Sequence, residues 1–312
     1  MKDEVRTLGL VSRPAVDSWG KGEAGLGYET QRLIRAGREI YGDVLLVNPF
    51  LVSVELPRAG GLPRIMHDGR PMPRVDSLFL RSTHRLGDAL NATLRCLLLL
   101  GCDILDPISR QGYGRGSKLG TSFTRFTGGV GSSTFLAFSL PAAMTLARKL
   151  ERGGRFPLIA KPVAGRGGIG VVRLDTPEAL ARHIKGLYGR APHSTLLLQP
   201  FEDFVNEYRV MVFFGTALGV VRKIPAAGAV AANAAQGGTF VPADRPDIVK
   251  FVLDNVDQVG ILGVDAGQTR AGEFTIIEAN RAPKWQEFDR ALGRDTARDL
   301  VLLARKRLDR QK

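Results

Sequence analysis

The chain has little of what disulfide-stabilised, redox and zinc proteins depend on. Among its 312 residues are two cysteines, Cys96 and Cys102, and four histidines. Both cysteines lie within or just after an apolar stretch with helical character, which indicates buried, reduced thiols rather than a disulfide or a metal pair. The histidines show no ligand spacing, and no Ser-His-Asp or Cys-His arrangement for covalent catalysis is evident. We therefore do not expect a metal centre with cysteine or histidine ligands.

Long apolar runs are also missing. The run Leu97–Leu100 is far too short to cross a bilayer. The first residues, Met-Lys-Asp-Glu, lack the apolar core of a signal peptide. We therefore expect a cytoplasmic protein without a membrane partner.

Acidic residues are the scarcer charged class. Lysine and arginine number 44 against 31 aspartates and glutamates, so the formal net charge is +13. This excess favours anionic partners such as nucleotide phosphates and acidic peptides. Nucleic acid is one such partner, but no basic motif interleaved with aromatic residues supports it, and a solvated basic surface explains the charge equally well. We therefore expect no nucleic-acid partner, and we leave homo-oligomerisation open.

The first part of the chain has a β-α-β pattern. Strand patterns at Val5–Val11 and Val44–Val47 flank a helical pattern at Tyr28–Ile40, so residues 1–107 are expected to form an α/β unit around a small parallel sheet. A later strand ends at Arg81, at the edge where open α/β sheets bind ligands. Position alone leaves two interpretations of Arg81, a ligand-binding residue or an exposed loop arginine.

A glycine-rich loop follows a strand that ends at Lys161. Its glycines are Gly165, Gly167, Gly168 and Gly170. Glycines let successive backbone N–H groups converge on phosphate oxygens, and the lysine adds a positive charge. No helix begins at the last glycine and no G-K-[ST] occurs, so this is not a P-loop. A flexible hairpin loop is the alternative. A second lysine, Lys118, lies in a Gly- and Ser-rich stretch that is either a linker or a phosphate-facing segment.

The stretch from Asp265 to Asn280 reads as strand, turn, strand, with Gly272 in the turn. Period-2 alternation places Glu278 and Asn280 on one face, and a hairpin would bring Asp265 close to both. Two carboxylates and an amide oxygen are hard donors that suit Mg²⁺ bound partly through phosphate. An ordinary polar surface hairpin is the alternative interpretation.

Taken in order, these motifs resemble one family. Lys161 with G-R-G-G-I-G is followed by Q-P-F, E-Y-R-V, N-A-A-Q-G-G and finally G-V-D with E-A-N. Residues 75–310 thereby resemble ATP-grasp enzymes, most of all the branch of RimK-like and glutathione-synthetase-like ligases. The resemblance implies an α/β fold in three parts that hold ATP between the last two. These are an N-terminal α/β (pre-ATP-grasp) domain at 1–107, a central subdomain with the glycine-rich flap at 108–200, and a C-terminal subdomain with the metal site at 201–312.

The resemblance also implies roles for individual residues. Lys118 and Lys161 are similar to the two lysines that reach the ATP phosphates, and the glycines at 165, 167, 168 and 170 to the flap above them. The residues similar to those that contact adenine and ribose are Gln199, Pro200, Phe201 and Glu207.

The metal and catalytic positions follow from the same resemblance. Asp265, Glu278 and Asn280 are similar to the Mg²⁺ ligands, with Mn²⁺ as an alternative ion. Arg222 looks like the arginine that faces the transferred phosphoryl group, and Asn233 lies in the stretch that closes over it.

The implied activity is ATP- and Mg²⁺-dependent ligation of a carboxylate and an amine through an acyl phosphate. Arg81 and Lys284 are cations suited to a substrate carboxylate, which favours an amino acid or an acidic peptide. The chain departs from the family's N-x-S-P-G after the last metal ligand, because Ala282 and Lys284 replace its serine and glycine. An ATP-grasp phosphotransferase and a catalytically silent nucleotide-binding protein are the alternatives.

Overall fold

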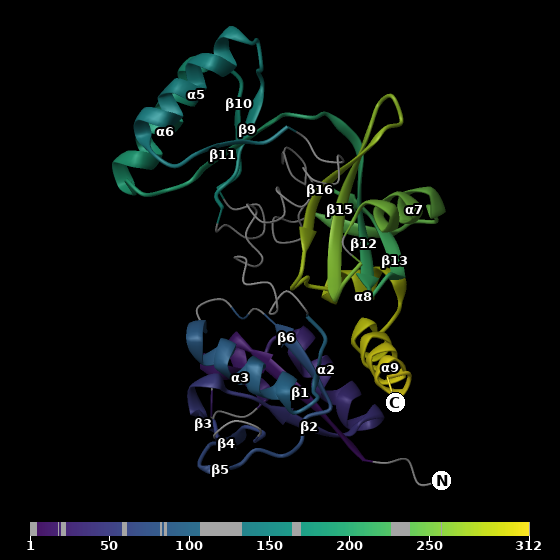
Figure 1. Cartoon of the computed structure of the whole chain (residues 1–312). Coiled ribbons are helices and arrows are strands. Elements are labelled where there is room, and N and C mark those ends of the chain that lie inside the picture. The colour runs from purple at the N-terminus through teal and green to yellow at the C-terminus, as the bar shows by residue number, and fades with distance from the viewer. Residues whose placement is uncertain are drawn as a thin grey trace. The chain divides into compact units, whose positions relative to one another are not determined.

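We analysed a computed structural model of the chain (Figure 1). It describes residues 5–17, 19, 23–57, 61–81, 83, 86–106, 133–163, 170–225, 238–256 and 258–311. The chain divides into two compact units, which we describe separately. Unit 1 comprises residues 1–112, 259–261 and 282–312, and unit 2 comprises residues 113–258 and 262–281.

Unit 1 is built on a parallel four-stranded sheet in the order β2-β1-β6-β7, as the β-α-β pattern predicts. Its strands are β1 (Arg6–Ser12), β2 (Gly42–Leu46), β6 (Ser77–Arg81) and β7 (Asp103–Ile104). A smaller antiparallel sheet, β3-β4-β5, accompanies it, with β3 (Val52–Glu55), β4 (Arg64–His67) and β5 (Arg70–Pro71). The helices of this unit are α1 (Arg13–Asp17), η1 (Glu23–Gly25), α2 (Tyr28–Ile40), η2 (Pro49–Leu51), α3 (Gly87–Leu99), α8 (Gln286–Leu292) and α9 (Thr296–Asp309).

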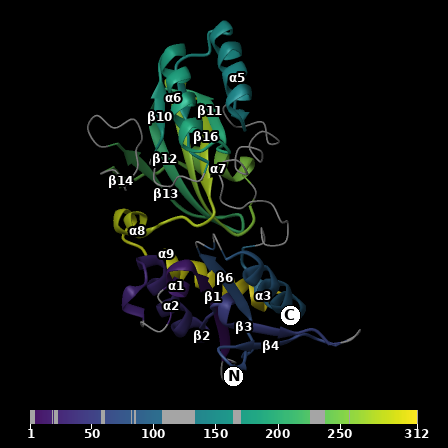
Figure 2. The same cartoon turned by 90° about the vertical axis from the view of Figure 1, so that its left-hand side faces the viewer.

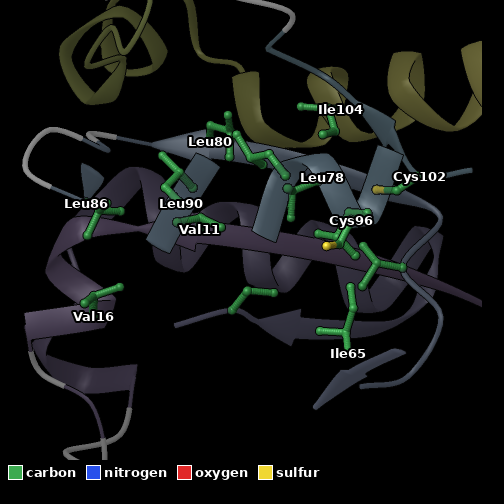
Figure 3. Packing of buried hydrophobic residues seen from close by; sticks show 14 residues of the cluster. Val11, Val16, Ile65, Leu78, Leu80, Leu86, Leu90, Cys96, Cys102 and Ile104 are labelled. Carbon is green, nitrogen blue, oxygen red and sulfur yellow. The ribbon is translucent and has the colours of Figure 1, made fainter. Parts of the chain in front are cut away.

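Helix α2 packs closely on this sheet because Gly37 has no side chain. A Cβ atom at Gly37 would lie 2.5 Å from Cγ2 of Val44 and 2.9 Å from Cδ2 of Leu8. On the other side of the sheet, apolar side chains of β6 and α3 form a buried core together with Val11 of β1 and Ile65 of β4 (Figure 3). Cys96 and Cys102 lie in this core as free, buried thiols, as predicted. Burial raises the pKa of Cys102 to about 12, which keeps its thiol protonated.

Unit 2 contains two sheets, of which the first is antiparallel. The first has the order β10-β9-β11-β8, with β8 (Phe135–Ala137), β9 (Leu158–Ala160), β10 (Val172–Leu174) and β11 (Leu196–Pro200). Its helices α5 (Leu140–Arg152) and α6 (Pro177–Arg190) lie side by side in both views (Figures 1 and 2). Each has a proline in its first turn, Pro141 in α5 and Pro177 in α6. The side chain of the preceding capping residue, Ser139 for α5 and Thr176 for α6, accepts a hydrogen bond from the helix backbone.

The second sheet of unit 2 has the order β14-β13-β12-β15-β16. Its strands are β12 (Phe204–Phe213), β13 (Thr216–Ile224), β14 (Thr239–Pro242), β15 (Ile261–Thr269) and β16 (Phe274–Asn280). Helix α7 (Pro246–Asn255) covers one face, where Ile248 and Val252 pack on apolar side chains of the central strands. The opposite face carries the charged residues described below.

No helix in the described part of the chain is long and apolar enough to cross a membrane. The division of residues 108–312 at position 200 stays a prediction, because both sheets fall within unit 2.

Candidate functional site

The hairpin of β15 and β16 forms where the sequence predicts it. Asp265 pairs with Glu278 and Gly263 with Asn280, so these side chains share one face of the sheet. Gly272 occupies the turn with a φ of 88°, a conformation that favours glycine.

Two neighbouring strands add charged residues to the same face. In β12 and β13, Glu207 pairs with Lys223 and Arg209 with Val221. Since β12 lies next to β15, Glu207, Arg209 and Lys223 lie beside Asp265. We call Glu207, Arg209, Lys223 and Asp265 the carboxylate–cation cluster.

The contacts within the carboxylate–cation cluster centre on Asp265. Arg209 donates to both oxygens of this carboxylate, from Nε to Oδ1 at 2.7 Å and from Nη2 to Oδ2 at 2.8 Å. Lys223 Nζ donates to Oδ2 of Asp265 at 3.1 Å and to Oε2 of Glu207 at 3.3 Å. The side chains of Lys223 and Asp265 are 4% and 6% exposed, so the ion pair between them is almost fully removed from water. A bidentate arginine fixes both the position and the plane of the carboxylate.

Burial and charge act in opposite directions on Asp265. Burial alone would raise its pKa, but the charges of Arg209 and Lys223 and their hydrogen bonds outweigh burial and lower the pKa to about 2. Burial likewise would lower the pKa of Arg209, whereas Asp265 and then Glu278 and Glu207 raise it. Asp265 is therefore ionised at neutral pH, and Glu278 lies close enough to act on the same arginine.

Arg222 does not lie in this cluster. It pairs with Tyr208 on the face toward α7, where it is exposed, and its Nη1 donates to Oδ1 of Asn206 at 3.5 Å. The cause is a register shift of one residue in the hairpin of β12 and β13, between Met211 and Val212, which leaves Leu218 of β13 unpaired. If residues are counted from the turn and the bulge is ignored, Arg222 pairs with Glu207. The bulge instead pairs Lys223 with Glu207, so Lys223 lies on the face that carries Asp265.

Lys161 lies directly after β9, as predicted, but its side chain has a partner that the sequence did not suggest. Its Nζ donates to Oε1 of Gln199 at 2.6 Å, and Nε2 of Gln199 donates to Oγ1 of Thr134 at 2.8 Å. The Gln199 side chain is buried and its amide is held from both ends. The predicted contact of Gln199 with adenine is not tested by the structure, and its side chain adds a means of positioning Lys161.

The other predicted nucleotide-binding residues lie around these. Pro200 ends β11 opposite Leu158, and the Phe201 ring lies 4.1 Å from the guanidinium of Arg173. Gly170 has a φ of 77°, and a Cβ atom there would lie 3.1 Å from Cγ of Pro162. The remaining predicted residues lie outside the described residues, namely Lys118, Gly165, Gly167, Gly168 and Asn233.

The two predicted substrate residues have different surroundings within unit 1. Arg81 is buried, donates from Nη2 to the carbonyl oxygen of Pro283 at 2.7 Å, and lies 4.4 Å from the centre of the Trp285 ring. The backbone N–H of Trp285 donates to Oε1 of Glu29 at 3.1 Å. Lys284, between these two contacts, is exposed. Arg81 is thus bound to the loop that follows β16, and Lys284 projects from it.

The described residues contain no group of three or more His, Cys, Asp or Glu side chains placed to hold a metal ion. The predicted set has two carboxylates and one amide, Asp265, Glu278 and Asn280, on paired strands. All three supply hard oxygen donors, which fits Mg²⁺ and excludes a preference for zinc.

Comparisons with known proteins show which families and folds the chain is similar to. A family model described as prokaryotic glutathione synthetase, ATP-grasp domain, matches residues 142–262. A probable alpha-L-glutamate ligase of Halorhodospira halophila (strain DSM 244 / SL1) is 26% identical over 279 residues, which cover 86% of this chain and 88% of that protein.

Solved structures share the fold over almost the whole length. The ATP-grasp ligase PsnB, complexed with minimal precursor, Mg and ADP, has a TM-score of 0.70 at 14% identity and covers 98% of both chains. The macrocyclase MdnC from Microcystis aeruginosa MRC, bound with precursor peptide MdnA, has a TM-score of 0.61 at 16% identity and covers 95% of this chain and 98% of that one. These similarities confirm the predicted fold class.

Proposed function

Because the chain belongs to the ATP-grasp superfamily of ligases, in the branch of RimK-like and glutathione-synthetase-like enzymes, we propose that it joins a carboxylate to an amine with conversion of ATP to ADP and phosphate. The observation that carries this proposal is the carboxylate–cation cluster. It presents an ionised Asp265 between two cations, on the face of the hairpin that also carries Glu278 and Asn280.

The metal would be held by Asp265, Glu278 and Asn280. When bound there together with ATP, Mg²⁺ would supply positive charge that stabilises the transferred phosphoryl group. The chain's own contribution is to keep Asp265 ionised and oriented, which Arg209 does through its two hydrogen bonds. Since Arg209 and Lys223 are held by hydrogen bonds to Asp265, they would cost little reorganisation during the reaction.

Two lysines are suited to the phosphates. Lys161 is positioned by Gln199 at the end of β9, directly before the glycine-rich loop. Lys223, rather than Arg222, is the cation that shares a face with Asp265, so we assign to Lys223 the role of facing the transferred phosphoryl group. Both ammonium groups would stabilise charge that develops on the phosphoryl oxygens.

The proposed reaction has two steps, transfer of the γ-phosphoryl group and formation of the amide. An oxygen of the substrate carboxylate attacks the γ-phosphorus, the bond to the β-phosphate oxygen breaks, and ADP leaves. The amine attacks the carbonyl carbon of the acyl phosphate, inorganic phosphate leaves with the electron pair of the C–O bond, and the amine loses a proton. No protein nucleophile takes part, which agrees with the absence of a catalytic triad from the sequence.

An amino acid or an acidic peptide is the proposed substrate class. The relative from Halorhodospira halophila is named a probable alpha-L-glutamate ligase. The structure of PsnB contains its minimal precursor, and that of MdnC contains the precursor peptide MdnA. Exposed Lys284 is suited to a substrate carboxylate. Arg81 is proposed to act through the loop that it holds, because its guanidinium already binds Pro283 and stacks on Trp285.

The test is phosphate release from Mg·ATP with panels of amino acids and acidic peptides, with products analysed by mass spectrometry. We expect a condensation product that forms only when an amine is present. A stable phosphorylated product formed without any amine would instead establish a phosphotransferase.

Two variants connect this test to the site. Glu278→Ala should abolish turnover in a folded protein, because it removes a metal ligand that is not a core side chain. Lys161→Met should weaken ATP binding by about 1.5–3 kcal/mol, the free energy of a charge-assisted hydrogen bond. Full activity of folded Glu278→Ala would remove the metal assignment, and unchanged ATP affinity of Lys161→Met by calorimetry would remove the phosphate contact.

A further inference from the structure

Both peptide groups that flank Lys284 are held by charged side chains of unit 1. Arg81 donates from Nη2 to the carbonyl oxygen of Pro283 at 2.7 Å, and Oε1 of Glu29 accepts the backbone N–H of Trp285 at 3.1 Å. The first group belongs to the peptide unit directly before the Cα atom of Lys284, and the second to the unit directly after it. Because each peptide unit is planar, fixing both units fixes the direction in which the Lys284 side chain leaves the backbone.

Burial separates Lys284 from its two neighbours in the chain. Pro283 and Trp285 are buried, whereas Lys284 between them is exposed. Pro283 also restricts the backbone, because its ring fixes φ. A lysine side chain is flexible, so the stiffness that a binding site requires must come from the backbone that carries it. The contacts on both sides of Lys284 provide this stiffness.

The position of Trp285 depends on contacts made by its neighbours. Trp285 is fully buried, and its indole Nε1 has no hydrogen-bond partner among the residues that the structure describes. A buried tryptophan N–H usually finds such a partner, so this ring is not oriented by its own polar group. The ring instead stacks on the guanidinium of Arg81 at 4.4 Å, while Glu29 holds the backbone N–H.

The contact with Trp285 comes from the first turn of α2. Glu29 is the second residue of this helix, and the hydroxyl of Tyr28 before it donates to Oδ2 of Asp289 in α8 at 3.0 Å. The first turn of α2 thus holds the loop and the helix that follows it. An acidic side chain in a first turn also interacts favourably with the positive end of the helix dipole. Two roles for Glu29 therefore have to be separated, an acceptor that holds the loop and a charge that only stabilises α2.

We propose that Glu29 is a positioning residue, which holds Trp285 and thereby directs Lys284 toward a carboxylate group of an acidic substrate. This inference rests on the proposed function, in which Lys284 binds that carboxylate. Glu29 does not contact the substrate, because two negative charges in contact repel each other. Its effect on the substrate therefore passes through the backbone of the loop and depends on Lys284.

The first experiment measures how well the Trp285 ring is protected from solvent, without substrate or nucleotide. The chain has two tryptophans, so Trp19→Phe leaves the fluorescence of Trp285 alone. In this background Glu29→Asp keeps the charge but shortens the side chain, so the acceptor no longer reaches the N–H of Trp285. The acrylamide quenching constant should then rise at least about twofold, because the loop opens locally.

Glu29→Gln makes the opposite change, because its amide oxygen accepts the same N–H although the charge is gone. It should keep the low quenching constant of the parent protein. Glu39→Gln is the matched control for loss of a charge from α2, since Glu39 lies near the other end of the helix in an exposed ion pair with Arg35. It should also leave the quenching constant unchanged.

The second experiment measures binding of a tetra-aspartate peptide by calorimetry, with Mg²⁺ and a non-hydrolysable ATP analogue present so that no turnover occurs. Lys284→Ala should weaken peptide binding about fivefold, the loss of one solvent-exposed ion pair. Glu29→Asp should weaken it about three- to fivefold through the same ion pair, with unchanged affinity for the ATP analogue. When Lys284→Ala is already present, adding Glu29→Asp should weaken binding no further, because the two residues act through one contact.

Four results would overturn the inference. In the first experiment these are a Trp285 ring that is equally protected in Glu29→Asp and the parent protein, and a Glu29→Gln variant that is as exposed as Glu29→Asp. In the second they are a wild-type protein that does not bind tetra-aspartate, and an effect of Glu29→Asp that is equal with and without Lys284. Failure of the proposed function is a separate result, namely no phosphate release with any substrate of the panel, because neither experiment depends on turnover.

Discussion

The two faces of the five-stranded sheet in unit 2 have opposite chemistry although the same strands build both. On one face Val210, Val264 and Ile276 pack under Ile248 and Val252 of α7. On the other face the same strands carry the carboxylate–cation cluster. Alternation of side chains along the strands produces this separation, together with a bulge in β16 at Ile277, which places Ile276 and Glu278 on opposite faces. The apolar face stabilises the fold, while the charged face requires that charges lose their hydration. We propose that ligand binding, rather than stability, accounts for the arrangement of the charged face.

The largest effect is expected on the charged face. Asp265→Ala would leave Arg209 and Lys223 buried without their shared counter-charge, which should lower the free energy of unfolding by about 3–5 kcal/mol. The same change should abolish turnover, because it removes a proposed metal ligand. Urea unfolding and an ATP turnover assay measure the two effects. If Asp265→Ala unfolded like the wild type, the contacts of this carboxylate would have no energetic consequence.

On the apolar face, Ile248→Ala should change stability without changing the site. Ile248 is fully buried beneath the sheet, and truncation of such a side chain costs about 2–5 kcal/mol through lost burial and the cavity that remains. Because Ile248 touches only the face toward α7, ATP affinity under conditions where the variant is folded should equal that of the wild type. A marked loss of affinity in calorimetry would mean that the two faces are coupled.

Two adjacent residues allow the most direct comparison of the faces. Lys223→Met removes a buried cation beside Asp265 and should lower kcat on the order of 10²-fold, as removal of one preorganised charge does. Arg222→Met, one position earlier, changes a side chain on the opposite face and should change kcat little. Steady-state kinetics of the pair measures both. If Arg222→Met were the more damaging of the two, the assignment of Lys223 would be rejected in favour of Arg222.

Local patterns explain which features could be predicted from the sequence. The turn of the hairpin from Asp265 to Asn280 and the shared face of Glu278 and Asn280 could be predicted, because alternation and one glycine are visible in adjacent residues. The bulge in β16 could not be predicted in this way. Lys223 could not be identified, because the one-residue bulge at Leu218 reverses the face of every later residue in β13. Arg81 also required the structure, since its partners Pro283 and Trp285 lie some 200 residues away in the chain. Register irregularities and distant contacts leave no periodic signal.

The two faces of the sheet should also differ in how their contributions to stability depend on pH, because only the charged face carries Asp265. The pKa of Asp265 is about 2 in the folded chain, against an ordinary value of 3.8. Because the folded pKa is the lower one, the unfolded chain binds more protons than the folded chain between pH 3.8 and pH 2. The stability that ionised Asp265 contributes is therefore complete above pH 3.8 and is lost as the pH falls from there toward 2. The amount is about 2 kcal/mol, since one pKa unit corresponds to roughly 1.4 kcal/mol.

Other carboxyl groups titrate in the same range, so the measurement must be a difference between variants. Asp265→Asn keeps the shape of the side chain but cannot ionise, and its stability deficit relative to the wild type should therefore shrink by about 2 kcal/mol between pH 5 and pH 2. Ile248→Ala is the matched control, because its deficit arises from apolar packing and should be the same at both pH values. Urea unfolding of the three proteins at each pH gives both differences. A deficit of Asp265→Asn that did not vary with pH would show that Arg209 and Lys223 do not stabilise the ionised carboxylate.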